Sequence, residues 1–322
     1  MPTLKTYNYA LNNEKSIRRG LQTLRGSRDI LPGKPVEIGS DRQLLMDRHV
    51  VDDINGAFRT VHQPVKHPAN PVISSEAGKD EGGPHSFGTV LREEDSGKFR
   101  MWTGTVDSDI LSRHGKSAPG SSVCVYFESD DGVEWRRPNL GLFDHWGNKH
   151  NNVFWNNIMD YVLPLPERMW DKGKYALMYQ PIVDEDAGTP NDNSLLKHFA
   201  YSDDGIHFTD APENPVLRGR SDTNNCIVYN SERDVFMQYR RSTINAGEIR
   251  RIAYSESDDL LSWTQPTTII ARDEADPLYL YGMPVSRYGD MYFGYLFCLW
   301  VHPRYEHLGN GKDFKMDTQL AW

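Results

Sequence analysis

A seven-residue phrase occurs three times in this chain and constrains its fold more than any other feature. It reads SDDGVEW at 129–135, SDDGIHF at 202–208 and SDDLLSW at 257–263. Asp and Gly tolerate the left-handed backbone angles of a tight turn, and the closing aromatic residue anchors the returning strand. Each copy therefore predicts a β-hairpin. Its return at roughly 55 to 75 residues predicts a repeat architecture.

Two apolar runs precede each hairpin and complete a four-stranded unit. The first runs are residues 88–91, 161–165, 226–229 and 281–285, and the second are 97–102, 173–179, 234–239 and 289–295. Each unit therefore reads strand, turn, strand, loop, strand, SDD turn and strand. This is the pattern of one antiparallel propeller blade. The predicted fold class is all-β, with blades at about 82–138, 160–210, 222–266 and 276–322.

The last predicted blade lacks its final hairpin. The run DTQLAW at 317–322 matches the third strand of the earlier blades, where an SDD turn follows. We therefore expect a propeller that is incomplete at its C-terminal end, because an unclosed ring leaves unpaired strand edges. Residues 1–40 are predicted to be an N-terminal extension, partly irregular or helical, and residues 41–322 to form the propeller domain.

Charge and composition exclude several classes of partner. The formal net charge is −9 and no Lys/Arg-rich run occurs, which argues against nucleic acid and anionic membranes. No stretch approaches the about 18 apolar residues of a membrane span. The first 26 residues contain no apolar signal segment, which favours a cytoplasmic protein by default. Cys124, Cys226 and Cys298 fall in predicted strands and are expected to be buried thiols; neither metal nor cofactor is predicted.

Acidic residues stand where the first strand of each predicted blade begins. They are Asp80 and Glu81 in blade one, Asp160 in blade two, Asp222 in blade three and Asp276 in blade four. Because innermost strands begin around a propeller axis, these carboxylates are expected to converge on one pocket. Glycoside cleavage needs two carboxyl groups, and crowding raises the pKa of one so that it stays protonated. The alternative is that each acid caps a turn at the mouth of the ring.

Several segments together resemble the five-bladed β-propeller glycosidase-like superfamily, which includes fructan-, arabinan- and mannoside-cleaving hydrolases and mannoside phosphorylases. They are HPANPV at 67–72, FRMW at 99–102, the SDDGxxW phrase and residues 276–285. The resemblance covers residues 42–322 and implies five blades and an oligosaccharide or glycoside substrate. It implies a base or nucleophile at Glu81 or Asp80, an orienting carboxylate at Asp160 and an acid at Asp222. Two features depart from the family pattern: Asp222 replaces the usual Glu, and DEGG at 80–83 replaces an Asp-Pro motif.

Four further residues are candidates for substrate binding, beside Asp80 and Asp276. His85 follows a Gly-Gly turn, Arg240 and Arg241 follow the second strand of blade three, and Tyr281 begins blade four. Histidine and arginine hold hydroxyl or carboxylate groups, and an aromatic ring offers a platform for a sugar. Loop capping, surface ion pairs and core packing are the corresponding structural alternatives.

Three functions fit these patterns. The first is a glycoside hydrolase that cleaves oligosaccharides through axial carboxylates. The second is a non-catalytic propeller that binds carbohydrate or protein. The third is a glycoside phosphorylase, which needs a basic phosphate pocket; Arg92, Arg240 and Arg241 are the cations available for it.

Overall fold

The computed structural model describes residues 38–40, 42–46, 56–58, 60, 62–76, 84–114, 118, 120–182, 196–217, 225–244, 249–274, 276–277, 279–289, 291–301 and 314–322. The chain divides into two compact units: residues 1–62, 273–276 and 288–291 form the first, and the rest forms the second. The strands of the predicted blades belong almost entirely to the second unit. Of the candidate site residues, Asp80, Glu81 and Asp222 lie outside the described residues, as do nearly all of residues 1–40.

The first sheet of the second unit corresponds to predicted blade one. Its antiparallel order is β1 (Pro84–Arg92), β2 (Phe99–Val106), β3 (Ser122–Ser129) and β4 (Trp135–Arg136). A further strand, β5 (Val153–Trp155), pairs with β3 and lies beyond the predicted blade boundary at residue 138. A short helix, α2 (Ser108–His114), follows β2. Seven residues are too few to show helical periodicity, so the sequence patterns did not indicate it.

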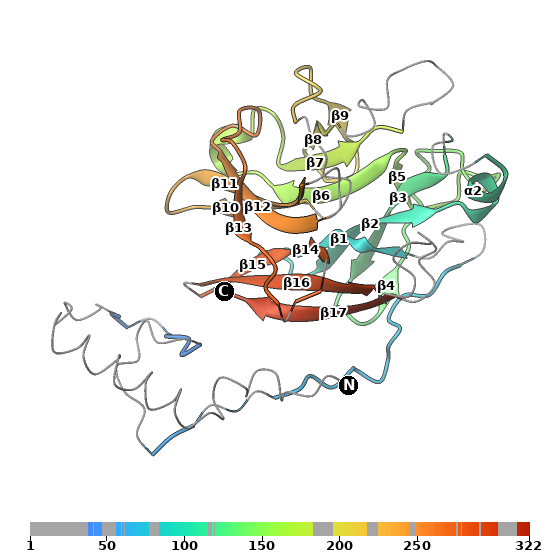
Figure 1. The fold of residues 1–322 in the computed structure, drawn as a ribbon. Helices are drawn as coiled ribbons and strands as arrows, with labels where there is room; N and C mark the ends of the chain where they lie inside the picture. The colour runs from blue at the N-terminus through green and yellow to red at the C-terminus, as the bar shows by residue number, and fades with distance from the viewer. Residues whose placement is uncertain are drawn as a thin grey trace. The chain divides into compact units, whose positions relative to one another are not determined.

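Blade two repeats this meander as a separate four-stranded sheet, whereas the strands of blades three and four belong to one eight-stranded sheet (Figure 1). Blade two consists of β6 (Ile158–Pro164), β7 (Tyr175–Gln180), β8 (His198–Ser202) and β9 (Thr209–Asp210), with a 3₁₀ turn at Glu167–Met169. Blade three consists of β10 (Cys226–Asn230), β11 (Val235–Ile244), β12 (Ile249–Ser257) and β13 (Thr267–Ile270). Blade four contains β14 (Tyr279–Gly282), β15 (Val285–Tyr288), β16 (Met291–Val301) and β17 (Phe314–Ala321). The all-β class is confirmed, and the number of blades stays a prediction.

The three SDD phrases form one identical turn on the outer hairpins β3–β4, β8–β9 and β12–β13. In the first copy, Ser129 Oγ accepts the amide of Gly132 at 2.9 Å, and Asp131 Oδ1 accepts the amides of Val133 and Glu134 at 2.8 Å. Gly132 has φ 77°, and Leu260 takes the same left-handed conformation in the third copy, with φ 65°. Leu260 is fully buried in the core between blades two and three. Side-chain burial therefore outweighs backbone strain at that position.

Consecutive blades pack face to face. Trp102 and Leu177 share a core between blades one and two, and Phe199 and Phe236 share one between blades two and three. The indole of Trp102 also donates a hydrogen bond of 2.6 Å to the carbonyl of Gly205, in the SDD turn of blade two. The outer turn of blade two is thus tied to blade one as well as to its own strands.

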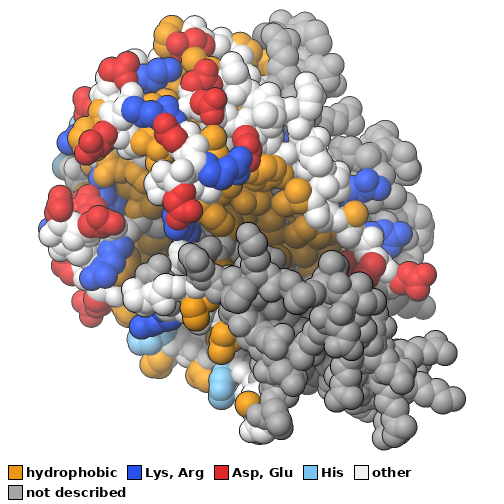
Figure 2. Space-filling view, turned by 90° about the vertical axis from the view of Figure 1, so that its left-hand side faces the viewer, with side chains coloured by type: hydrophobic (Ala, Val, Ile, Leu, Met, Phe, Trp, Pro, Cys, Tyr) orange, Lys and Arg blue, Asp and Glu red, His pale blue; other side chains and the backbone are white. Residues whose placement is uncertain are grey.

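Blade four presents apolar side chains on both faces. Leu296 and Cys298 are buried in the core shared with blade three. On the other face, Tyr295 and Leu320 are paired across β16 and β17 and are 45% and 44% exposed; Trp322 is 54% exposed. Figure 2 shows hydrophobic side chains gathered in a central hollow of its view, below acidic and basic side chains. Among the described residues, β17 pairs with β16 alone.

We expect Leu260→Gly to lower the free energy of unfolding by about 1 to 4 kcal/mol. The lost side chain costs about 2 to 5 kcal/mol, whereas relief of the left-handed backbone returns about 1 kcal/mol. Urea unfolding measures the difference. The control is Gly132→Ala, which adds strain at the equivalent position while its new Cβ meets Phe99 at an ordinary 3.6 Å. A Leu260→Gly protein at least as stable as the wild type would contradict the prediction.

We expect Leu320→Lys to reduce self-association, because it places a charge in the exposed apolar face of β17. Light scattering over a range of protein concentrations measures this. The control is Val65→Lys, which adds the same charge at a residue that is 94% exposed and lies outside the strands. Equal scattering by both variants and the wild type would show that this face does not drive association.

Candidate functional site

One end of each blade collects buried polar side chains away from the SDD turns. In an antiparallel blade, the first strand begins where the second ends and the third begins. Buried residues at this end of their blades, which we name the polar end, are Asp107, Asp160, Lys197, Asn225 and Arg241. Because buried polar groups need partners, the contacts of these residues indicate what the polar end can do.

Asp160 is the centre of a buried ionic group between blades two and three. Its Oδ2 lies 2.7 Å from Nζ of Lys197, and both side chains are only 4% exposed. Asn225 Nδ2 donates to Asp160 Oδ1 at 3.0 Å, and Lys197 Nζ donates to Gln180 Oε1 at 3.1 Å. One carboxylate is thus held by an ammonium and an amide that come from two other parts of the chain.

Backbone irregularities place both members of the ion pair. Asp160 lies at a break in the β6–β7 register, where Met159 pairs with Tyr179 and Tyr161 with Met178. Such a bulge re-aims the side chain that it carries. Lys197 is held just ahead of β8 by its amide, which donates to the carbonyl of Leu217 at 2.9 Å. The ion pair therefore depends on local geometry that no residue pattern displays.

The predicted convergence of four carboxylates stays a prediction, because three of the acids lie outside the described residues. Those three are Asp80, Glu81 and Asp222. The fourth blade's acid, Asp276, belongs to the first unit. Its Oδ2 accepts the amide of Asp273 at 3.0 Å, so in the structure it closes its own turn. His85 lies within β1, but its side chain is not part of what the structure describes.

Arg240 and Arg241 point to opposite faces of β11, since neighbouring residues of a strand alternate. Burial lowers the pKa of Arg240. Arg241 is 5% exposed, so it is not a surface cation, and its guanidinium carbon lies 5.3 Å from the ring centroid of Tyr281. Burial, and secondly the positive charge of Arg250, lowers the pKa of Arg241 to about 10. Tyr281 is thus engaged by a cation at the start of blade four.

Asp107 is a buried carboxylate that the sequence patterns did not single out. Its Oδ1 accepts the amides of Asp109 and Ile110 at 3.0 and 2.9 Å, which caps α2. Its Oδ2 lies 3.4 Å from Nε2 of His145, whose pKa is lowered by burial. An Asp just before a short polar run is an N-cap signal that could have located it. Its contacts assign it a structural role.

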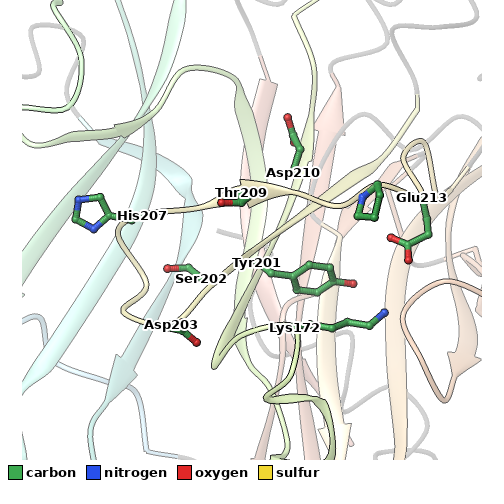
Figure 3. Close-up of a pocket in the computed structure, with 9 residues that line it drawn as sticks. Lys172, Tyr201, Ser202, Asp203, His207, Thr209, Asp210 and Glu213 are labelled. Carbon is green, nitrogen blue, oxygen red and sulfur yellow. The ribbon is translucent and has the colours of Figure 1, made fainter.

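A hollow beside the outer strands of blade two is shown in Figure 3. Lys172 extends along the ring of Tyr201, 5.5 Å from its centroid, toward Glu213. Asp210 points away and accepts a hydrogen bond from the hydroxyl of Tyr179. The carboxylates that line the hollow therefore do not face each other across it. The polar end is the better candidate site.

The cysteines are buried thiols, as predicted. Burial raises the pKa of Cys124 to about 12 and that of Cys226 to about 11, so both stay protonated. Within the described part of the chain, no group of three His, Cys, Asp or Glu side chains is placed to hold a metal ion. In the same residues, no helix has the length and apolar character needed to cross a membrane.

Comparison with known proteins gives matches of structure only. No protein-family model and no curated protein sequence matches the chain. The β-fructofuranosidase of Bombyx mori has a TM-score of 0.45 and 16% identity, over 70% of this chain and 43% of that one. An exo-1,5-α-L-arabinanase from a bovine ruminal metagenomic library has a TM-score of 0.44 and 8% identity, over 72% of each chain. Sucrose-6-phosphate hydrolase of Lactobacillus gasseri has 0.42 and 12%, over 66% of this chain and 40% of that one.

The chain therefore spans less than half of the length of the fructofuranosidase.

We expect Lys197→Met to lower the free energy of unfolding by about 3 to 5 kcal/mol, because it leaves the buried carboxylate of Asp160 without its counter-charge. The double variant Asp160→Leu/Lys197→Met should recover most of the loss, since it removes both charges. Denaturant unfolding of the two single variants and the double variant measures the coupling.

The matched control for this cycle is the exposed pair Arg136–Asp130, with N···O 2.6 Å and side chains 54% and 60% exposed. Arg136→Met should change stability little, because solvent screens the pair. Equal effects of Lys197→Met and Arg136→Met would show that burial does not set the strength of the Asp160 pair.

Proposed function

We propose that this protein is a carbohydrate-active propeller, a glycoside hydrolase whose site lies at the polar end of its blades. The observation that carries the proposal is the buried Asp160 group: a carboxylate at a bulge in the first strand of blade two, fixed by Lys197 and Asn225. A preorganised carboxylate beside the start of blade three suits the orientation of a sugar in the transition state. A five-bladed propeller is the architecture that we propose around it.

The proposed roles follow from this geometry and from the family resemblance. Asp222 would protonate the leaving oxygen of the glycosidic bond, and Glu81 would activate water or attack the anomeric carbon itself. Asp222 precedes Asn225 by three residues, and Asn225 contacts Asp160, which supports placing the acid beside the orienting carboxylate. Because Asp160 is already held by an ammonium and an amide, a fixed acceptor for a sugar hydroxyl suits it better than proton transfer.

The same contacts give a second candidate function. The carboxylate of Asp160 is paired within the protein, and Asp276 closes its own turn. Both observations suit a propeller that binds carbohydrate without cleaving it. The two functions differ in turnover, which an assay detects directly.

We expect Glu81→Gln and Asp222→Asn each to lower kcat on a cleaved glycoside by about 100-fold or more, because each removes a proton-transfer or nucleophilic group. The assay uses a panel of aryl glycosides and oligosaccharides. Asp80→Asn separates Glu81 from its neighbour, and Asp130→Asn, in the SDD turn of blade one, is the control expected to keep wild-type turnover.

Wild-type turnover in both Glu81→Gln and Asp222→Asn would refute their assigned roles. A wild-type protein that binds sugars but cleaves none of the panel would favour the binding function.

A further inference from the structure

The hollow of Figure 3 lies at the end of blade two that carries the SDD turn. Its volume is about 390 Å³, within the about 300 to 1,000 Å³ of small-molecule sites. Lys197 stands directly ahead of β8, whereas Tyr201, which lines the hollow, is four residues further on. At about 3.3 Å per residue, this places the hollow about 13 Å along the strand from the Asp160 group. It is therefore separate from the polar end.

Tyr201 replaces an acidic residue of the repeat. The residue before the SDD serine is Glu128 in blade one, Tyr201 in blade two and Glu256 in blade three. In blade three this glutamate forms an ion pair of 2.7 Å with Arg233. Lys172 takes the place of this arginine in blade two, because each stands three residues before the residue that pairs with the SDD serine. Blade two thus keeps the cation of this pair and lacks the glutamate.

The replacement leaves two polar groups without hydrogen-bond partners in the described part of the chain. Lys172 Nζ lies 5.5 Å from the ring centroid of Tyr201, and no carboxylate of the described residues forms an ion pair with it. Tyr201 is 8% exposed, and its buried hydroxyl has no hydrogen-bond partner among the same residues. Because a buried hydroxyl without a partner is unfavourable, this feature needs an explanation.

Glu213 adds a hydrogen-bond acceptor to these donors. Burial, and secondly the negative charge of Glu213, raises the pKa of Tyr201 to about 12, so its hydroxyl keeps its proton. Figure 3 shows the hydroxyl of Tyr201, the ammonium of Lys172 and the carboxylate of Glu213 at one end of the hollow. A bound molecule can therefore find donors and an acceptor in the same place.

We infer that this hollow binds a neutral ligand rich in hydroxyl groups, of which a sugar is the common example. A hydroxyl group both donates and accepts, so one sugar can accept from Lys172 and donate to Glu213. A simple anion is opposed by Asp203 and Glu213, and a simple cation by Lys172. The stem of Lys172 is flexible, and its movement off the ring gives the sugar access to the hydroxyl of Tyr201. The inference holds whether or not the protein cleaves glycosides.

Saturation-transfer NMR tests the site, with galactose, sucrose and the zwitterion glycine as separate probes. We expect the sugars to bind the wild type, and Lys172→Gln and Glu213→Gln each to weaken that binding about 10-fold or more, since each removes a charged hydrogen-bond partner.

The matched control is Lys174→Gln, which should keep wild-type affinity. It removes a lysine that lies at the same 5.5 Å from an aromatic centroid, that of Trp170, but does not line the hollow. A sugar bound at the polar end contributes equally to both lysine variants, so their difference reports the hollow alone.

Thermal unfolding tests the unpartnered hydroxyl of Tyr201 independently of Lys172. Without sugar, Tyr201→Phe should be at least as stable as the wild type, because it removes a buried polar group that lacks a partner. The control Tyr126→Phe should lower the Tm, because the hydroxyl of Tyr126 accepts a hydrogen bond of 2.6 Å from Arg100. Added sugar should raise the Tm of the wild type more than that of Tyr201→Phe.

Equal sugar affinity in the wild type and Lys172→Gln would overturn the site, and so would a loss of stability in Tyr201→Phe without sugar. Binding of glycine in place of the sugars would overturn the assignment to a neutral hydroxylated ligand. A protein that cleaves no glycoside but loses sugar binding in Lys172→Gln would refute the hydrolase and keep the site. Turnover of glycosides without sugar binding that depends on Lys172 would refute the site and keep the hydrolase.

Discussion

Face-to-face packing of consecutive blades is the constraint on which the rest of this structure depends. The sheets of blades one to three bury apolar side chains against their neighbours, as Trp102, Phe199 and Phe236 show. A face that is covered by another sheet has no room for solvated groups. Polar side chains that could bind or react with a ligand are therefore confined to the ends of the strands, where the loops are exposed to solvent. The SDD turns occupy one end and stabilise it, which leaves the other end of each blade for polar side chains.

Two groups of charged side chains lie at that end of the blades. Asp160 and Lys197 neutralise each other, and amides satisfy their other atoms. Such a group is rigid and suits the fixing of a sugar. Arg241 and Arg250 both lie against the ring of Tyr281, and the positive charge of Arg250 lowers the pKa of Arg241.

Short-range patterns predicted much of the fold and less of the site. The SDD turns were predictable because each is built from hydrogen bonds among four or five consecutive residues. The position of Asp160 at the start of blade two was also predictable, from the alternation of turns and apolar runs. Its pairing with Lys197 was not predictable. It depends on the β-bulge that orients Asp160 and on the hydrogen bond from the Lys197 amide to Leu217, which holds Lys197 in place. The pairing of β5 with β3 was not predicted for the same reason, whereas Asp107 caps α2 through local hydrogen bonds, so a sequence signal for that cap exists.

The sequence by itself determined the strand order, the turns and the buried state of the three cysteines, since these depend on residue type and on neighbours in the chain. The tertiary structure alone decided which polar residues meet. It separated Arg240 from Arg241 by the alternation of β11, brought Arg250 to Arg241 across a hairpin, and set both against a tyrosine of the next blade. The physical reason is that electrostatic and hydrogen-bonding contacts act through space within a few ångströms, whereas a sequence orders residues only along the chain.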